Sequence, residues 1–167
     1  MKFNDLVNNI LEQADLPPPP PAMVQQFDLP DRDKDILATL LVKEAGGERD
    51  YIAGMAAVMN VIFNRAKGDP RNFVREATRK LQFSAFNAVK TPQQMTMVIS
   101  DTKKHKAFEA AKAMVQRAIQ GKLTDITDKS THYYAASGPN KIKPPKWADS
   151  TKTTNKIGHH QFYRGIK

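Results

Sequence analysis

The chain has 167 residues, of which 40% are hydrophobic and 26% are charged, enough for one compact domain with a core and a short appendage. It contains no cysteine, which excludes disulfides, thiolate nucleophiles and cysteine-ligated zinc sites. Lys and Arg outnumber Asp and Glu by 26 to 17. The resulting net charge of +9 predicts a polyanionic partner or an anionic surface, such as nucleic acid or the bacterial envelope, although a solvated basic face explains it equally well.

No apolar run approaches the roughly 18 residues that a membrane span needs, and residues 1–15 lack the charged-then-apolar pattern of a signal peptide. We therefore expect synthesis in the cytoplasm without a signal peptide. An action outside the cytoplasm would then require another carrier, such as a membrane lesion or a virus particle.

The first 30 residues differ in character from the rest. Residues 1–15 place apolar side chains at helical spacing, which predicts a short amphipathic helix. Residues 16–30 form a proline-rich linker, in which Pro17 to Pro21 impose an extended polyproline segment. The helix is interpreted as a docking segment for a partner such as a virion protein, and the alternative is that it packs on its own domain.

A single domain over residues 31–167 begins with a predicted helix from Asp31 to about Ala45, capped by Asp31 or Asp33 and ended by two glycines. A second helix follows a cap at Asp50.

Further helices are expected over Phe73–Leu81 and Lys104–Gln120, because apolar residues recur there with the helical period. Two segments rich in threonine and aromatic residues, Thr131–Ala135 and Gly158–Tyr163, flank a long proline-containing loop and predict strands. The predicted fold class is α+β, mainly α, with a small β-hairpin or ribbon beside a helical core.

Glu44 is the candidate for acid chemistry. Leu37, Leu40 and Leu41 form the apolar stripe of the first helix, and Glu44 occupies the next position on that stripe. A carboxyl group on an apolar face in the last turn of a helix tends to keep its proton, as a general acid requires. The alternative is a structural ion pair with Arg65 or a lysine.

Five motifs, in order, resemble those of the SleB-like cell wall hydrolases. The first is the run Lys43–Glu48 and the helix that closes on Asn64 and Arg65; the others are Gln82–Phe86, His132–Ala135, Pro145–Ala148 and Ile157–Tyr163. The resemblance covers about residues 35–165. His159 departs from the family, in which asparagine is common at this position, and residues 138–144 form a lysine-rich loop of uncertain length relative to the family.

The resemblance implies a lysozyme-like fold and cleavage of the β-1,4 bond between N-acetylmuramic acid and N-acetylglucosamine in peptidoglycan. It also implies a lytic transglycosylase reaction, for which Glu44 is carried over as the single catalytic residue. A muramidase that uses water would need a second carboxylate. Asp50 is better explained as a helix cap and Glu48 as an exposed loop residue.

Side chains that could bind a sugar come from the same motifs. His132 and Tyr134 share one face of the predicted strand, while Tyr133 points to the other. Trp147 could stack on a sugar ring or anchor the proline loop. For Phe83 a core position is favoured. The substrate-binding candidates are Gln82, Ser84, His132, Tyr134, Trp147 and His160.

No cofactor or metal is expected, because the histidines lack the spacing of metal-ligand motifs and adjacent histidines on a strand point to opposite faces. The expected partner is bacterial peptidoglycan. The layout suits a bacteriophage endolysin or a virion-associated wall hydrolase. The rival outside enzymes is a basic nucleic-acid-binding or structural protein, which the charge allows but no recognised binding motif supports.

Overall fold

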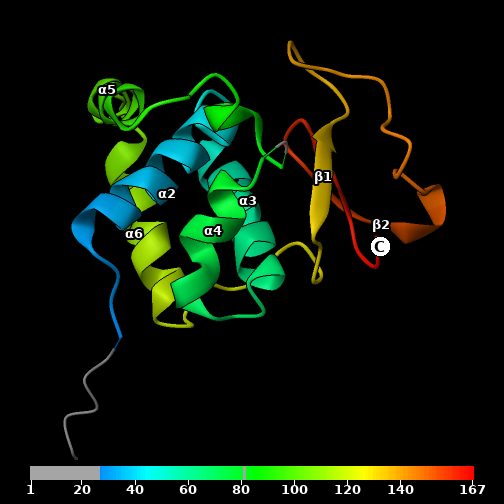
Figure 1. Cartoon of the computed structure of the whole chain (residues 1–167). Coiled ribbons are helices and arrows are strands. Elements are labelled where there is room, and N and C mark those ends of the chain that lie inside the picture. The colour runs from blue at the N-terminus through cyan, green and yellow to red at the C-terminus, as the bar shows by residue number, and fades with distance from the viewer. Residues whose placement is uncertain (1–26, 81) are drawn as a thin grey trace, which may run out of the picture.

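The computed structural model of the protein describes residues 27–80 and 82–167. Within them a bundle of helices lies on one side and a small antiparallel sheet on the other (Figure 1). No helix in this part of the chain is long and apolar enough to cross a membrane. The expected N-terminal helix and most of the expected linker fall outside the described residues.

Helix α2 (Asp31–Ala45) lies at the centre of the bundle. It contacts each of the other α-helices of the described residues, which are α3 (Tyr51–Arg65), α4 (Phe73–Thr78), α5 (Pro92–Thr102) and α6 (Phe108–Ile119). Short 3-10 turns occupy Pro70–Asn72, Ser84–Phe86 and Ser150–Lys152.

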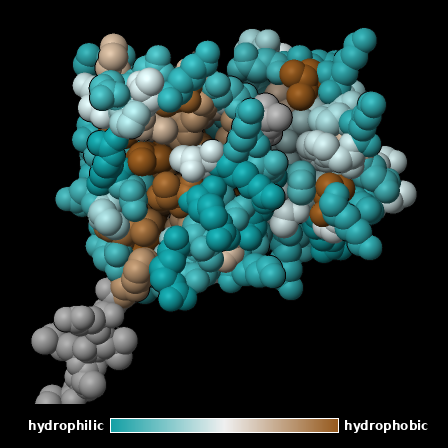
Figure 2. All heavy atoms as spheres, in the orientation of Figure 1, coloured by the Kyte–Doolittle hydropathy of each residue, from teal (hydrophilic) through white to brown (hydrophobic). Residues whose placement is uncertain are grey.

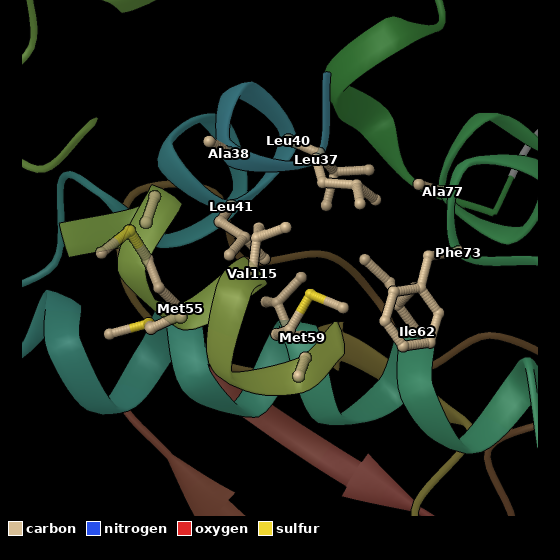
Figure 3. Close-up of a cluster of buried hydrophobic side chains, with 14 of the residues drawn as sticks. Leu37, Ala38, Leu40, Leu41, Met55, Met59, Ile62, Phe73, Ala77 and Val115 are labelled. Carbon is tan, nitrogen blue, oxygen red and sulfur yellow. The ribbon is translucent and has the colours of Figure 1, made fainter. Parts of the chain in front are cut away.

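The core between α2, α3, α4 and α6 is built from the apolar faces that the 3.6-residue period predicts (Figure 3). Leu37, Leu40 and Leu41 of α2 are fully buried against Met59 of α3 and Val115 of α6. Each such side chain contributes roughly 1.5–3 kcal/mol on burial, so this cluster stabilises the position of α2 against α3 and α6. Leu29, near the end of the expected linker, is also buried in this core.

The helix ends confirm some predictions and correct others. Asp50 caps α3 by accepting a hydrogen bond from the Ala53 amide at 3.3 Å, as predicted. The predicted cap of α2 is wrong: Pro30 occupies the cap position and no side chain caps the helix. Asp31 and Asp33 instead lie in its first turn, where their charges interact favourably with the helix dipole.

Two predicted helices are shorter than expected. The helix predicted over Phe73–Leu81 ends at Thr78, and the one predicted to start at Lys104 begins at Phe108. The residues before Phe108 belong to the turn that follows α5. Helix α5 itself was not predicted, because it buries only Ile99 and Thr102 and so shows little apolar periodicity.

The sheet has three antiparallel strands in the order β1-β3-β2: β1 (His132–Ala135), β2 (Thr153–Ile157) and β3 (His160–Tyr163). The pairing of β1 with β3 confirms the predicted ribbon. Strand β2 was missed, because it is largely polar and exposed. In Figure 2 the visible face is mostly hydrophilic, and its apolar areas gather mainly over the helical half.

Candidate active site

A pocket of about 700 Å³ lies between the end of α2 and the β1–β2 loop. The candidates predicted from the sequence all line it: Glu44, Gln82, Ser84, His132, Tyr134, Trp147 and His160. The pocket also includes Lys43, Arg65, Tyr133 and Lys141, which were not predicted as site residues.

Glu44 is half-buried, and its carboxylate accepts three hydrogen bonds. Oε1 accepts from the Ser84 hydroxyl and from the Ala85 amide, both at 2.8 Å. Oε2 accepts from the Tyr133 hydroxyl at 2.8 Å. These donors come from the 3-10 turn Ser84–Phe86 and from strand β1, so the carboxylate is held where the helical and sheet parts of the domain meet.

The alternative of a structural ion pair for Glu44 finds no support among the described residues, where Glu44 forms no salt bridge. The nearby Arg65 uses its Nε to donate to the Thr131 carbonyl at 2.6 Å, and its guanidinium lies 5.3 Å from the ring centre of Phe83. Burial lowers the pKa of Arg65, which nevertheless stays a cation at neutral pH.

Tyr133 lies on the inner face of the sheet, as the strand period predicts for a residue between His132 and Tyr134. Its ring packs against those of His160, Phe162 and Phe83, at centroid distances of 4.8, 5.3 and 6.1 Å. Burial, followed by the charge and hydrogen bond of Glu44, raises the pKa of Tyr133 well above its usual value. The phenol therefore keeps its proton at neutral pH and donates a hydrogen bond to the carboxylate form of Glu44.

His132 and Tyr134 lie on the outer face and contact Trp147, at ring-centroid distances of 5.1 and 6.2 Å. Tyr163 of β3 completes this aromatic group, 5.4 Å from Trp147. Burial, and then the charge of Arg65, lower the pKa of His132 to about 4, so its imidazole is neutral at pH 7. Trp147 is half-buried and lies edge-on to Tyr134 and Tyr163. Its indole therefore packs against the sheet and also lines the pocket.

The interpretation of Glu48 as an exposed loop residue is wrong. Its side chain is only 9% exposed, and its Oε1 lies 3.1 Å from Nδ1 of His160. Glycines at 54 and 158 leave the space that its Oε2 occupies. Glu48 does not line the pocket, so the second carboxylate in this region sits behind His160.

Among the described residues, no group of three or more His, Asp or Glu side chains is arranged to hold a metal ion. Glu44, held among hydrogen-bond donors and beside aromatic, amide and hydroxyl groups, gives the pocket the character of a glycoside-cleaving site. The site thus combines one carboxylate with hydrogen-bonding side chains and aromatic rings in a mainly helical domain.

Residues 49–163 match the family model described as Cell Wall Hydrolase, and the chain belongs to this family. It is therefore an enzyme that degrades the peptidoglycan of the cell wall. The match begins five residues after Glu44, so Glu44 lies just outside it.

The structure is similar to that of the catalytic domain of the germination-specific lytic transglycosylase SleB from Bacillus anthracis. The TM-score is 0.53 and the identity 24%, over 81% of this chain and 97% of that domain. This likeness confirms the predicted fold class. No curated protein was found to match the chain.

Proposed function

We propose that the enzyme is a lytic transglycosylase that cleaves the β-1,4 bond between N-acetylmuramic acid and N-acetylglucosamine, with Glu44 as its single catalytic residue. The observation that carries this proposal is the carboxylate of Glu44, which lines the pocket and is fixed by three hydrogen-bond donors.

The three donors indicate which oxygen of Glu44 carries the proton when the group acts as an acid. Oε1 faces the Ala85 amide, a donor that cannot reverse. Oε2 faces only the Tyr133 hydroxyl, which can rotate and act as an acceptor. A protonated Glu44 therefore carries its proton on Oε2.

In the first step Oε2–H of Glu44 gives its proton to the glycosidic oxygen while the bond from C1 of the muramic acid to that oxygen breaks. In the second step the C6 hydroxyl of the same muramic acid attacks C1 and gives its proton to the Glu44 carboxylate. The products are a free 4-hydroxyl on the departing sugar and a 1,6-anhydro ring, and Glu44 is returned to its acid form.

The choice of transglycosylase over muramidase rests on the carboxylates. Hydrolysis of a glycoside uses a pair of carboxylates on opposite sides of the bond. Within the described part of the chain, Glu44 is the only carboxylate that lines the pocket, and Glu48 lies behind His160. A reaction in which the substrate supplies its own nucleophile needs one carboxylate only.

The remaining candidates are proposed to bind the glycan. Gln82 and Ser84 offer hydrogen bonds to acetamido and hydroxyl groups beside Glu44, and neutral His132 can donate and accept. Tyr134 and Trp147 provide flat apolar surfaces for sugar rings, and His160 contributes a polar imidazole to the lining.

The test is digestion of purified peptidoglycan by the wild type and by Glu44→Gln, with mass spectrometry of the released muropeptides. Glu109→Gln, at an exposed position on α6, is the matched control for loss of one carboxylate. Anhydro products from the wild type and the control, and none from Glu44→Gln, are expected. Reducing ends would identify a muramidase, and intact wall with the wild type would overturn the proposal.

The route to the wall is a further part of the proposal. The predicted helix at residues 1–15 and its proline-rich linker suit attachment to a virus particle or another carrier, as in a bacteriophage endolysin or a virion-associated hydrolase. Deleting residues 1–15 should then abolish co-sedimentation with the carrier and leave the digestion of purified wall intact.

A further inference from the structure

The lining of the pocket carries more positive than negative charge. It contains the cations Lys43, Arg65 and Lys141 and one carboxylate, that of Glu44. None of these three cations forms a salt bridge within the described residues, although Lys34, Lys103 and other lysines elsewhere in this part of the chain do. A cleft lined by charges of one sign concentrates the field and attracts groups of the opposite sign.

The three cations are not equivalent. Arg65 is tied to the Thr131 carbonyl and lies over Phe83, so its position is explained by the fold. Lys43 and Lys141 are exposed, and within the described residues neither side chain forms a hydrogen bond or an ion pair. They are the two cations at the pocket that are available to a ligand.

The backbone around Lys141 is held in place. The Ile142 amide donates to the Ala135 carbonyl at 3.0 Å, which fastens the loop to the end of β1. The Lys141 amide donates to the Gly138 carbonyl at 3.2 Å, closing a turn. No acidic residue occurs between Ala136 and Ala148, so nothing within the loop itself neutralises Lys141.

The nearest acid along the chain is already engaged. Asp149 accepts hydrogen bonds from the amide and the hydroxyl of Thr151. The Asp149 side chain thereby caps the 3-10 turn that starts at Ser150. The loop therefore presents its positive charge at the rim of the pocket.

Resting on the proposed function, we propose that Lys43 and Lys141 form a subsite for the free carboxylates of the peptide stems of peptidoglycan. The glycan backbone itself is uncharged when each lactyl carboxyl is joined to a stem, so the sugars give these lysines no anionic partner. The stems are attached to the muramic acid whose C1 must lie at Glu44, which brings their carboxylates to the lining of the same pocket. The substrate class is therefore peptidoglycan with acidic stems.

The test compares one soluble peptidoglycan fragment in two forms: with its stem carboxylates free, and with the same carboxylates converted to amides by carbodiimide and ammonia. The full-length wild type, Lys141→Gln, Lys141→Arg and Lys156→Gln are assayed on both. Lys156 is exposed on β2 and does not line the pocket, so Lys156→Gln controls for the loss of one positive charge. Lys141 is chosen because Lys43 adjoins Glu44.

The quantity measured is the ratio of kcat/KM for the free-acid fragment to kcat/KM for the amidated fragment. Because charge contacts at exposed sites are weak, we expect a ratio of about fivefold for the wild type and a fall to about twofold in Lys141→Gln. Lys141→Arg should restore the ratio and Lys156→Gln should leave it as in the wild type. High salt should bring all ratios towards one.

Equal kcat/KM on the two fragments, or an unchanged ratio in Lys141→Gln, would overturn this subsite while leaving the proposed reaction in place. A loss of activity on both fragments in equal measure would mean that Lys141 acts on the glycan or on the fold, and would overturn it too. Failure of the wild type to cleave either fragment would instead count against the proposed function.

Discussion

The hydroxyl of Tyr133 lies 2.8 Å from Oε2 of Glu44, although the two residues are 89 positions apart in the chain. This hydrogen bond joins the last turn of α2 to the inner face of the sheet. It places a donor with a strongly raised pKa on the one carboxylate that the proposed reaction uses. The phenol therefore orients Glu44 without competing for its proton at neutral pH.

Tyr133→Phe removes this donor and keeps the ring that packs against His160 and Phe162. A hydrogen bond to a charged group contributes about 1.5–3 kcal/mol, so kcat should fall on the order of tenfold or more. The measurement is release of muropeptides under saturating substrate. Tyr51→Phe, a half-buried tyrosine on α3 away from the pocket, is the control. Equal kcat values for both variants would show that the hydroxyl does not position Glu44.

Ser84→Ala should have a smaller effect than Tyr133→Phe. Ser84 shares Oε1 of Glu44 with the Ala85 amide, which stays in place when the hydroxyl is lost. Because the Ala85 amide keeps Oε1 hydrogen-bonded after this loss, we expect a cost of about 1 kcal/mol, below the usual range for a bond to a charged group, and a fall in kcat of roughly fivefold. The same digestion assay measures kcat. A larger fall for Ser84→Ala than for Tyr133→Phe would mean that the hydrogen bond to Oε1 of Glu44 matters more than the one to Oε2.

The sequence predicts well those elements whose apolar residues repeat with a regular period. Helix α2 runs over the predicted residues because its leucines face the core. Helix α5 was missed because most of its residues are exposed, and strand β2 because its side chains are polar. The periodicity of apolar residues cannot reveal a helix or strand that buries only a few side chains.

At the site, the residues that the family motifs nominate all line the pocket, but the sequence could not supply the contacts between them. Strand alternation placed Tyr133 opposite His132 and Tyr134, which is correct. That the inner face meets Glu44 depends on how the sheet packs against α2, and no local pattern encodes this. The burial of Glu48 was missed for the same reason, because it depends on β3 bringing His160 close to the turn between α2 and α3.

The pair of Glu48 and His160 leads to a prediction about protonation. Burial lowers the pKa of His160, and the charges of Glu48 and then of Glu44 oppose this by favouring the protonated ring. Glu48→Gln removes the larger of the two opposing charges, so the pKa of His160 should fall further. Glu44→Gln should lower it less. NMR titration of the imidazole protons tests this ranking, with Glu109→Gln as the control, and a raised pKa in Glu48→Gln would contradict the pairing.

Gly158→Ala should destabilise the protein more than an ordinary change in a turn. Gly158 has φ +57°, and a Cβ at this position would collide with Oε2 of Glu48. The left-handed conformation costs alanine about 1 kcal/mol, and displacing a buried carboxylate adds roughly 1–3 kcal/mol.

Gly121→Ala is the matched control for this change, since Gly121 has φ +67° and open space around its Cβ position. Urea unfolding should therefore give a loss near 1 kcal/mol for Gly121→Ala and a clearly larger one for Gly158→Ala. Similar losses would mean that Glu48 moves aside without cost, and that its place behind His160 is not fixed by packing.

His132 makes stability depend on pH. Its pKa is about 4 in the folded protein and near 6.5 in the unfolded chain, so between these values the unfolded chain binds a proton that the folded state does not. The free energy of unfolding should therefore fall as the pH drops from 6.5 towards 4. The full difference between the two pKa values corresponds to about 3 kcal/mol of unfolding free energy. Because the ring is half-exposed and screened by solvent, we expect a loss of about 1 kcal/mol.

His132→Gln removes the imidazole that binds this proton. The free energy of unfolding of the variant should therefore fall less than that of the wild type as the pH drops. Urea unfolding at pH 7 and at pH 5 measures the change, and taking the difference between variant and wild type cancels the carboxyl groups that both share. His105→Gln, at an exposed position away from the pocket, is the control. If His132→Gln follows the wild-type curve, the imidazole takes up a proton in the folded state as readily as in water, and packing against Trp147 does not exclude solvent from it.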